Sequence, residues 1–276
     1  MKKVLVTGGK GFIGRNIISA LSRSSESDIA SFDEEIFEND DWSSWVKNFL
    51  SDNTPTGVLH VGACSDTQEK DSQFMFERNF EVTKLLVDWC KHHKIPLVYS
   101  SSAANYGTNG LYPSNLYGWS KYTAEQYVAS NWGISLRYFS VFGPGEEEKG
   151  RMSSIFFQAH ALMEKGSSIG IFPGNPRRDF VFVDDIISSN LYALKFFSDF
   201  NYKIFEVGTG TAHSFEEGLE YLGYSYFYLP ETEVPVGYQY LTQADSKRFL
   251  PDWKPSIDFF IGLARYKKYL NTLEIR

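Results

Sequence analysis

Short apolar runs alternate with longer stretches of helical spacing through the first half of this chain of 276 residues. The apolar, β-rich runs predict strands at residues 3–6, 29–32, 57–61, 96–100 and 134–139. Between them, apolar residues that recur every three to four positions predict helices at residues 12–23, 42–51, 72–93 and 117–131. Alternation of this kind is typical of an α/β fold, in which helices cover both faces of a parallel sheet.

Composition excludes several classes of function. The net charge is −7, and Lys and Arg form no block longer than a pair, so nothing favours a nucleic acid as the partner. No run of about 18 apolar residues occurs, so we expect no membrane span. Cys64 and Cys90 lie far apart, and neither the cysteines nor the histidines have metal-ligand spacing. We therefore expect reduced thiols in a cytoplasmic protein without a metal site.

The segment VLVTGGKGFIG, residues 4–14, carries glycines where an apolar strand passes into a helix. The pattern Gly9-x-Gly11-x-x-Gly14, overlapped by a second one that starts at Gly8, permits a tight turn and a close approach of the backbone to a pyrophosphate. The following helix offers unpaired N–H groups and the positive end of its dipole. Because a strand precedes the glycines and a helix follows them, the segment predicts a Rossmann-type, doubly wound dinucleotide-binding domain rather than an incidental turn.

Asp33 ends the second predicted strand, 19 residues after Gly14. A carboxylate at this place can accept a hydrogen bond from the ribose 2′-OH of a dinucleotide. Acidic residues follow, among them Glu34, Glu35 and Glu38, with no Arg or Lys to neutralise a 2′-phosphate. We therefore expect NAD as the cofactor, with NADP as the second choice; the alternative is an aspartate in an acidic, solvated loop.

Prolines break the pattern into short pieces after Gly143. We place a lobe boundary there. Residues 1–142 are expected to form the dinucleotide-binding domain, and residues 143–276 mainly a smaller substrate-binding lobe. The segment around 179–208 is expected to return to the first domain.

The segment YSSSAANYG, residues 99–107, precedes the sequence Tyr117-Gly-Trp-Ser-Lys121. A Tyr and a Lys four positions apart share one helix face, where the ammonium would favour phenolate and lower the tyrosine pKa. Ser102, at the end of the preceding strand, can hydrogen-bond the same substrate oxygen. Tyr-x-x-x-Lys alone is often structural, but here the set predicts an acid/base site that takes a proton from an alcohol while hydride leaves its carbon.

These motifs are similar to those of the extended short-chain dehydrogenase/reductases, the family of nucleotide-sugar epimerases and dehydratases. The resemblance covers nearly the whole chain and includes TGGKGFIG, the Tyr117 and Lys121 pair, Asn79-x-x-x-Thr83 and RDFVFVDDI (178–186). Within the family, several segments look most like the heptose 6-epimerases, which invert C6″ of an ADP-linked heptose. These segments are HVGACSDTQEKD (60–71), SSAANYG (101–107), GPGEEEKGRM (143–152), RRDFVFV (177–183), VGTGTAHSF (207–215) and YQYLTQAD (238–245).

The resemblance implies roles for individual residues. Tyr117 would be the redox acid/base, assisted by Lys121 and Ser102, and Lys149 a second acid/base on the opposite face of the sugar. The implied cofactor contacts, which include the glycines and Asp33, are Gly8, Gly11, Phe12, Ile13, Gly14, Asp33, Gly62, Ala63, Cys64, Ser65, Asn79, Tyr117, Lys121 and Val141. A nucleotide-diphosphate sugar would be held by Ser102, Ser140, Arg151, Gln158, Phe172, Arg178 and Tyr238. The resemblance also implies a homo-oligomer, formed through helix faces, that makes a heptose precursor for a bacterial surface polysaccharide such as lipopolysaccharide.

Lys149 follows three glutamates in GPGEEEKGRM. An epimerase that oxidises an alcohol and returns hydride to the other face of the carbon needs a second acid/base, because one group cannot serve both oxygen positions. Glu146, Glu147 and Glu148 would raise the pKa of a neighbouring lysine. We expect them to point away from Lys149, or burial of Lys149 to outweigh them. The alternative is an exposed Lys–Glu pair on a loop, which contributes little.

Three positions depart from the heptose 6-epimerase pattern, since Ser140 replaces Asn, Arg151 replaces Ser and Gln158 replaces His. A 4-epimerase or 4-reductase of a UDP-, GDP- or dTDP-linked sugar therefore stays open; such enzymes do not require Lys149. A dehydratase is disfavoured because Ala103 and Ala104 stand where that class carries Asp and Glu. A non-catalytic dinucleotide sensor would have lost its Tyr or Lys at 117 or 121, and both are present.

Overall fold

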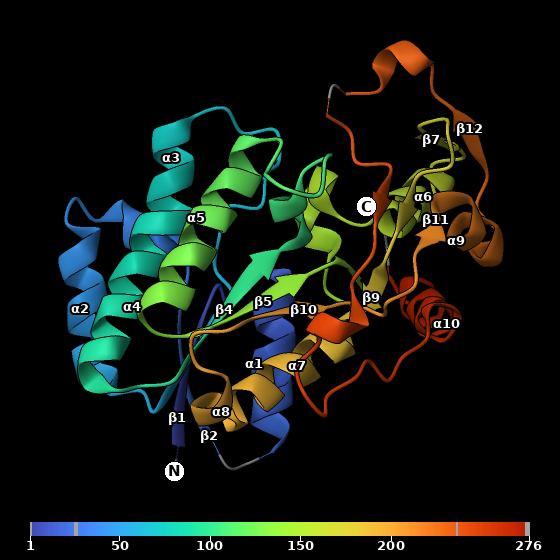
Figure 1. Ribbon diagram of the computed structural model, residues 1–276. Coiled ribbons are helices and arrows are strands. Elements are labelled where there is room, and N and C mark those ends of the chain that lie inside the picture. The colour runs from blue at the N-terminus through green and yellow to red at the C-terminus, as the bar shows by residue number, and fades with distance from the viewer. Residues whose placement is uncertain (1, 25–26, 236, 274–276) are drawn as a thin grey trace.

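A six-stranded sheet forms the centre of the larger part of the molecule, in the order β2-β1-β3-β4-β5-β10 (Figure 1). The computed structural model describes residues 2–24, 27–235 and 237–273. Every neighbouring pair of strands in this sheet is parallel, which confirms the predicted α/β fold with a doubly wound parallel sheet. The strands are β1 (Lys2–Thr7), β2 (Ser27–Phe32), β3 (Gly57–His60), β4 (Leu97–Ser102), β5 (Ile134–Tyr138) and β10 (Ile204–Val207).

Helices cover both faces of this sheet, and alternate strand residues face opposite layers. Val4 and Val6 belong to the buried cluster shared with α1 and α7, whereas Leu5 belongs to the cluster shared with α2, α4 and α5. Figure 1 shows these two helical layers on either side of the strands. Because both faces are buried, the strands are nearly continuous apolar runs. The helices are α1 (Phe12–Arg23), α2 (Trp42–Asn53), α4 (Val82–His93), α5 (Leu116–Asn131) and α7 (Val183–Lys195).

The strand order differs from the usual doubly wound order on one side. The usual six-stranded order places one more strand outside the second strand. Here the chain runs from α2 directly to β3, which lies on the other side of β1, so β2 is the edge strand. The winding therefore reverses between β1 and β3, and ligands of such sheets bind in the crevice at the carboxyl ends of the strands at this point.

The predicted helix over residues 72–93 contains a local widening. It consists of α3 (Ser72–Phe76), a π-helical turn (Glu77–Glu81) and α4. Single π-helical turns within α-helices are frequent at functional sites. This turn contains Asn79, one of the predicted cofactor contacts.

Residues 143–182, 208–235 and 237–273 form elements outside the large sheet, called the smaller lobe below. They pack on the same side of the sheet as α1 and α7. Its aromatic core includes the contacting rings of Phe142, Phe156 and Phe180, and it continues without interruption into the cluster under α7. β10 of this half of the chain closes the edge of the large sheet beside β5, and α7 packs on α1. The remaining elements are α6 (Ile155–Met163), α8 (Phe197–Phe200), α9 (Phe215–Leu222), α10 (Phe259–Leu270), β6 (Ser140–Phe142), β7 (Ile169–Ile171), β8 (Arg177–Arg178), β9 (Phe180–Phe182), β11 (His213–Ser214), β12 (Tyr226–Tyr228) and β13 (Leu241–Thr242).

Candidate active site

The carboxyl ends of the strands open into a cavity of about 940 Å³. Its walls come from the turns after β1, β2 and β3, from the end of β4, from α5 and from the start of the smaller lobe. Most of the residues predicted for the site line it, although they come from distant parts of the sequence. These residues are Gly8, Gly11, Phe12, Ile13, Gly14, Asp33, Gly62, Ala63, Cys64, Ser65, Ser102, Tyr117, Lys121, Ser140, Val141, Lys149 and Arg178.

Backbone segments at the cavity floor approach one another so closely that only glycine fits. Gly8 has φ +68°, and a Cβ on it would lie 2.6 Å from the Cα of Gly62. A Cβ on Gly14 would lie 2.0 Å from the carbonyl oxygen of Gly8. The turns after β1 and β3 and the start of α1 therefore form a cradle without side chains. Such a cradle fits the pyrophosphate of a dinucleotide, which the N-terminus of α1 would hold.

The end of β2 is strongly acidic, as the sequence predicts. The Asp33 carboxylate accepts the Lys10 N–H at 3.1 Å through each oxygen, and burial raises its pKa. The Lys10 ammonium is already paired with Glu35 at 3.0 Å. A 2′-phosphate at this place would face two carboxylates, whereas a ribose hydroxyl can donate to Asp33. The residues present therefore fit the unphosphorylated ribose of NAD.

Arg78 is a cation near this end of the cavity that the sequence pattern missed. Its guanidinium carbon lies 4.2 Å from the ring centroid of Phe37 and 3.7 Å from that of Phe74, and the residue lines the cavity. The helical segment α3–α4 brings it beside the turn after β2, which is far away in the sequence. No local spacing marks it, so only the fold shows it.

Asn79, a predicted cofactor contact, is not among the residues that line the cavity. It is 1% exposed, and its Oδ1 accepts the Cys64 N–H at 2.7 Å. Its Nδ2 donates to the Cys64 carbonyl and to the Ser120 hydroxyl, each at 2.9 Å. The π-helical turn thus presents an amide that satisfies both backbone groups of Cys64. Asn79 shapes the 62–65 turn and joins it to α5, and the turn itself lines the cavity.

Lys121 is buried at the cavity wall, and Tyr117, one turn earlier on α5, is half-buried there. The Asn115 side chain caps the helix by accepting the Gly118 N–H at 2.8 Å, which fixes the first turn that carries Tyr117. Burial lowers the pKa of Lys121 to about 7, while the nearby Glu125 acts in the opposite direction. The Lys121 ammonium also lies 4.3 Å from the ring centroid of Tyr99.

The expected depression of the Tyr117 pKa is not found. Burial raises the pKa of Tyr117, and a hydrogen bond with the Ser102 hydroxyl only partly opposes this. The reason is that the phenol is removed from water, and desolvation disfavours phenolate. The raised pKa favours the neutral phenol of Tyr117, which lies in hydrogen-bond contact with Ser102, the serine that the sequence paired with it.

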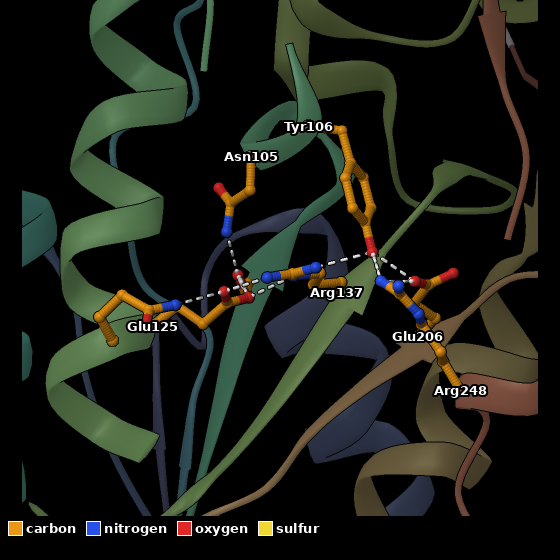
Figure 2. A network of polar contacts seen from close by, with 8 residues as sticks. Asn105, Tyr106, Glu125, Arg137, Glu206 and Arg248 are labelled. Atoms are coloured by element: carbon orange, nitrogen blue, oxygen red, sulfur yellow. Dashed lines mark hydrogen bonds and ion pairs between the residues drawn. The ribbon is translucent and has the colours of Figure 1, made fainter. Parts of the chain in front are cut away.

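Behind Lys121, a buried polar network extends from α5 across the sheet (Figure 2). The fully buried Glu125 carboxylate accepts from Arg137 at 2.7 and 2.6 Å and from the Ser101 hydroxyl at 2.7 Å. Arg137 then donates to the Tyr106 hydroxyl at 2.7 Å, which reaches Glu206 on β10. Residues 117, 121 and 125 share one helix face, and this repeated spacing is the signal that marks Glu125 in the sequence.

The three glutamates of the 143–152 loop point to partners other than Lys149. Glu146 is fully buried and accepts the N–H and hydroxyl of Ser154 at 2.6 and 2.7 Å, at the start of α6. Glu147 accepts the Tyr269 hydroxyl at 3.0 Å. Glu148 pairs with Arg15 of α1.

Lys149 itself is half-buried and lines the cavity. Its ammonium lies 5.3 Å from the ring centroid of Phe12, at the start of α1. Burial lowers the pKa of Lys149, and Glu146 opposes this shift without reversing it. A lysine with a lowered pKa exchanges a proton more readily near neutral pH. Lys149 and Tyr117 therefore line one cavity and come from different lobes.

The wall on the side of the smaller lobe is aromatic and carries one of the predicted cations. The Arg178 guanidinium lies 5.5 Å from the ring centroid of Phe215 and 5.2 Å from that of Tyr238. Tyr238 in turn contacts Phe172, with ring centroids 4.9 Å apart. Phe172 and Tyr238 are not among the residues that line the cavity. A half-buried arginine that lines a cavity is suited to a phosphate.

Arg151 and Gln158, two predicted substrate contacts, are not among the residues that line the cavity. Arg151 is exposed, pairs with Asp66 and donates to Gln68 at 3.0 Å. Gln158 donates to the Ser153 carbonyl at 2.8 Å. Arg151 points away because acidic and amide groups of the 66–68 turn bind it on the surface.

The described parts of the chain contain neither a metal-binding cluster nor a membrane-spanning helix. Within residues 2–24, 27–235 and 237–273, no group of three His, Cys, Asp or Glu side chains could hold a metal ion. None of the helices in the same ranges has the length and apolar character required to span a membrane.

Comparison with known proteins gives a consistent result. Residues 4–208 match the model of the NAD dependent epimerase/dehydratase family. The chain is 34% identical, over 316 aligned residues, to ADP-L-glycero-D-manno-heptose-6-epimerase of Brachyspira hyodysenteriae, with 98% of each chain covered.

Solved structures agree on the fold. ADP-L-glycero-D-manno-heptose-6-epimerase of Helicobacter pylori aligns with a TM-score of 0.83 and 23% identity, over 99% of this chain and 97% of that one. UDP-glucose 4-epimerase of Thermotoga maritima, bound to UDP-glucose, aligns with a TM-score of 0.82 and 22% identity, over 98% of both chains. The predictions of a nucleotide-sugar epimerase and of NAD as cofactor are confirmed at the level of the family. The chain belongs to the NAD-dependent epimerase/dehydratase family.

Proposed function

We propose that this enzyme converts ADP-D-glycero-D-manno-heptose to ADP-L-glycero-D-manno-heptose by inverting C6″, with Tyr117 and Lys149 as acid/bases on opposite faces. The observation that carries this proposal is the placement of Lys149. It lines the same cavity as Tyr117, burial lowers its pKa, and all three neighbouring glutamates have other partners. An ordinary loop ion pair has none of these properties. The choice of substrate is supported by the name of the relative that is 34% identical to this chain, ADP-L-glycero-D-manno-heptose-6-epimerase.

Tyr117, Lys121 and Ser102 would form the first acid/base centre. Oxidation of the C6″ alcohol removes a proton from its oxygen and a hydride from its carbon. In one configuration the oxygen would lie at Tyr117, which accepts the proton as phenolate when the alcohol is oxidised and donates it as the neutral phenol when the carbonyl is reduced; the Ser102 hydroxyl would orient the oxygen. When bound, NAD supplies the acceptor and later the donor of the hydride. Lys121 would hold the cofactor beside Tyr117.

Lys149 would form the second centre. Once the carbonyl has turned over, the hydride returns to its other face, and the oxygen then lies at Lys149. The ammonium of Lys149 donates the proton that completes the alcohol, and in the reverse direction the neutral amine removes it. Arg178 would hold the nucleotide diphosphate, which keeps this end of the substrate fixed while the carbonyl turns.

A second candidate is a 4-epimerase or 4-reductase acting on a UDP-, GDP- or dTDP-linked sugar. The observation that favours it is Ser140, which lines the cavity where the heptose 6-epimerase pattern has Asn. Such an enzyme needs only Ser102, Tyr117 and Lys121. Lys149 would then be dispensable.

We also infer a cytoplasmic homo-oligomer. Both cysteines, Cys64 and Cys90, are free thiols, which fits a reducing compartment. The exposed Trp119 on α5 stacks on the exposed Tyr112, an apolar surface that fits self-association through this helix. Light scattering tests the inferred oligomer and should give a mass at least twice that of one chain.

The deciding experiment incubates the purified enzyme with ADP-D-glycero-D-manno-heptose and follows the configuration at C6″ by NMR. UDP-glucose and GDP-mannose are incubated in parallel. The proposal predicts turnover of the heptose. Turnover of only the two hexose nucleotides would support the second candidate and leave the family assignment intact.

A further inference from the structure

Arg15 links the cradle of glycines to the loop that carries Lys149. It lies on α1, and its guanidinium donates to the Lys10 carbonyl through Nε at 3.1 Å and Nη2 at 2.7 Å. The same Nη2 donates across the cavity rim to the Glu148 carboxylate, and Nη1 lies 4.0 Å from Oε1 of Glu147. One planar group thus joins the turn after β1 to two residues that directly precede Lys149.

Phe12 completes this contact from the same helix. Phe12 and Arg15 are three positions apart on α1, so they are neighbours on one helix face. The Lys149 ammonium lies over the Phe12 ring, and the adjacent Glu148 is bound by Arg15. We define the α1 seat as Phe12 and Arg15. It meets the loop at three consecutive residues, Glu147, Glu148 and Lys149.

The loop has little regular structure of its own at this point. Its 3₁₀-helical stretch (Glu147–Met152) is interrupted immediately after Lys149, where Gly150 has φ +54°. The other anchors lie on both sides of Lys149. Glu146 accepts from Ser154 and the Asn16 amide donates to the Pro144 carbonyl at 2.9 Å before it, and Arg151 binds Asp66 and Gln68 after it. Among these contacts, the α1 seat is the one that meets the Lys149 side chain and the adjacent Glu148.

The contact is too exposed to contribute much to folding. The side chains of Arg15 and Glu148 are 31% and 70% exposed, and exposed ion pairs contribute little to stability. Catalysis is more sensitive than stability, because a misplacement of about 1 Å can reduce a rate by about a hundredfold. A contact that is weak in stability can therefore be important for the position of an acid/base.

We propose that Arg15 is a positioning residue, which holds Glu148 and thereby fixes Lys149 over Phe12 for its half of the reaction. The inference rests on the proposed function, in which Lys149 serves one configuration and Tyr117 the other. It carries a specific consequence. Loss of Arg15 should impair the oxidation of one epimer and spare the oxidation of the other, since Tyr117 is held by α5 and has no contact with this seat among the described hydrogen bonds.

The first measurement is independent of activity. Lys149 in wild type, Arg15→Met and Glu148→Gln is labelled with an amine-reactive reagent, and the labelled peptide is quantified by mass spectrometry over time. Because the half-buried amine would lose its seat, we expect labelling to accelerate on the order of tenfold in Arg15→Met and less in Glu148→Gln. The matched control is Arg265→Met, which removes a similarly exposed ion pair with Asp184, and it should label as wild type does.

The second measurement separates the two faces. At saturating NAD, each variant is mixed with either C6″ epimer in a single turnover, and hydride transfer is followed at the absorbance of reduced nicotinamide. Arg15→Met should slow one epimer on the order of tenfold to a hundredfold and leave the other unchanged. Arg15→Lys, which retains the charge and loses the two-pronged contact with Lys10, should fall between wild type and Arg15→Met.

Each outcome decides a separate point. Unchanged labelling with unchanged rates, or equal slowing of both epimers, overturns the positioning role of Arg15. Faster labelling in Arg15→Met, together with full epimerisation by Lys149→Met, would leave the seat standing and refute the proposed function.

Discussion

Tyr117 and Lys149, the two proposed acid/bases, are held in very different ways. Tyr117 is half-buried on α5, a helix of 16 residues whose start is capped by Asn115 and whose inner face is fixed by the buried Glu125–Arg137 pair. Lys149 is half-buried in a short 3₁₀ stretch that breaks at Gly150. One group belongs to the sheet scaffold, and the other is delivered by a loop of the smaller lobe that is fastened by exposed ion pairs.

In the proposed mechanism, this difference matches what an inverting reaction requires. The first acid/base would be fixed relative to the cofactor by elements that also line the cofactor end of the cavity. The second would serve the opposite face of the same carbon, and Lys149 enters the cavity from a separate loop, where the contacts of the glutamates take the place of helix packing.

The largest effect should come from the rigid centre. Tyr117→Phe removes the hydroxyl that exchanges the substrate proton, and we expect epimerisation to fall by about 10²–10⁴-fold, the usual contribution of general acid–base catalysis. Folding and NAD binding should stay near wild type because the ring remains. The matched control is Tyr122→Phe on the same helix, measured in the same NMR assay. Equal activity of the two variants would remove Tyr117 from the mechanism.

The second prediction concerns the buried Glu125–Arg137 pair, which supports α5 behind Tyr117. Glu125→Ala leaves the mostly buried Arg137 guanidinium without its carboxylate, and breaking one partner of a buried pair costs about 3–5 kcal/mol. We expect the free energy of unfolding in urea to fall by about this amount. Arg265→Ala, which breaks an exposed pair, should change it by about 1 kcal/mol or less. Similar losses in both variants would mean that the network does not support α5 as described.

The 62–65 turn, which lines the cavity, is the third target. Asn79→Ala leaves the N–H and the carbonyl of Cys64 without their amide partner, a loss of about 1–3 kcal/mol for an unsatisfied buried group. Because this turn lines the cavity, we expect the Kd for NAD to rise by about tenfold. Asn53→Ala, which removes an amide on the outer helix α2, is the control for calorimetric titration. An unchanged Kd would contradict the shaping role.

The smallest effect is a pH dependence of cofactor binding. Lys121 has a pKa of about 7 in the cofactor-free site because burial disfavours its charge. A cofactor that binds the ammonium raises this pKa, so its affinity is fully present below pH 7 and is lost as the pH rises above it. We expect the Kd for NAD to increase by about fivefold between pH 7 and pH 8, because the protonated fraction of a group with a pKa of about 7 falls by about this factor. Fluorescence titration should show this slope in wild type and a flat profile in Lys121→Met. Because burial holds the pKa of His60 at about 3, His60 does not titrate in this range.

Features encoded by local spacing could be predicted from the sequence. The glycine turn, the strands and the Tyr117–Lys121 pair each depend on neighbours within about one turn of helix or strand, and the structure contains them at the expected positions. The parallel sheet follows from their alternation. The raised pKa of Tyr117 could not be predicted in this way, because the pKa of a side chain depends on everything packed around it.

Features that depend on contacts between distant segments could not be predicted. Arg78 reaches the turn after β2 only because the sheet brings α3 beside it. Arg151 is turned outward by Asp66, and Glu148 is bound by Arg15, pairs that are 85 and 133 residues apart in sequence. A charge count along the chain assigns such groups to solvent or to a ligand, because their partners are not visible locally.

The central claim is that the loop lysine does chemistry, and Lys149→Met tests it most directly. The measurement is the rate of C6″ inversion of ADP-D-glycero-D-manno-heptose by NMR, with the exposed Lys165→Met as the matched control. The account predicts that Lys149→Met loses inversion by about 10²–10⁴-fold, while it still binds NAD and Lys165→Met remains fully active. Inversion by Lys149→Met at the wild-type rate would contradict the account and return this lysine to the surface of its loop.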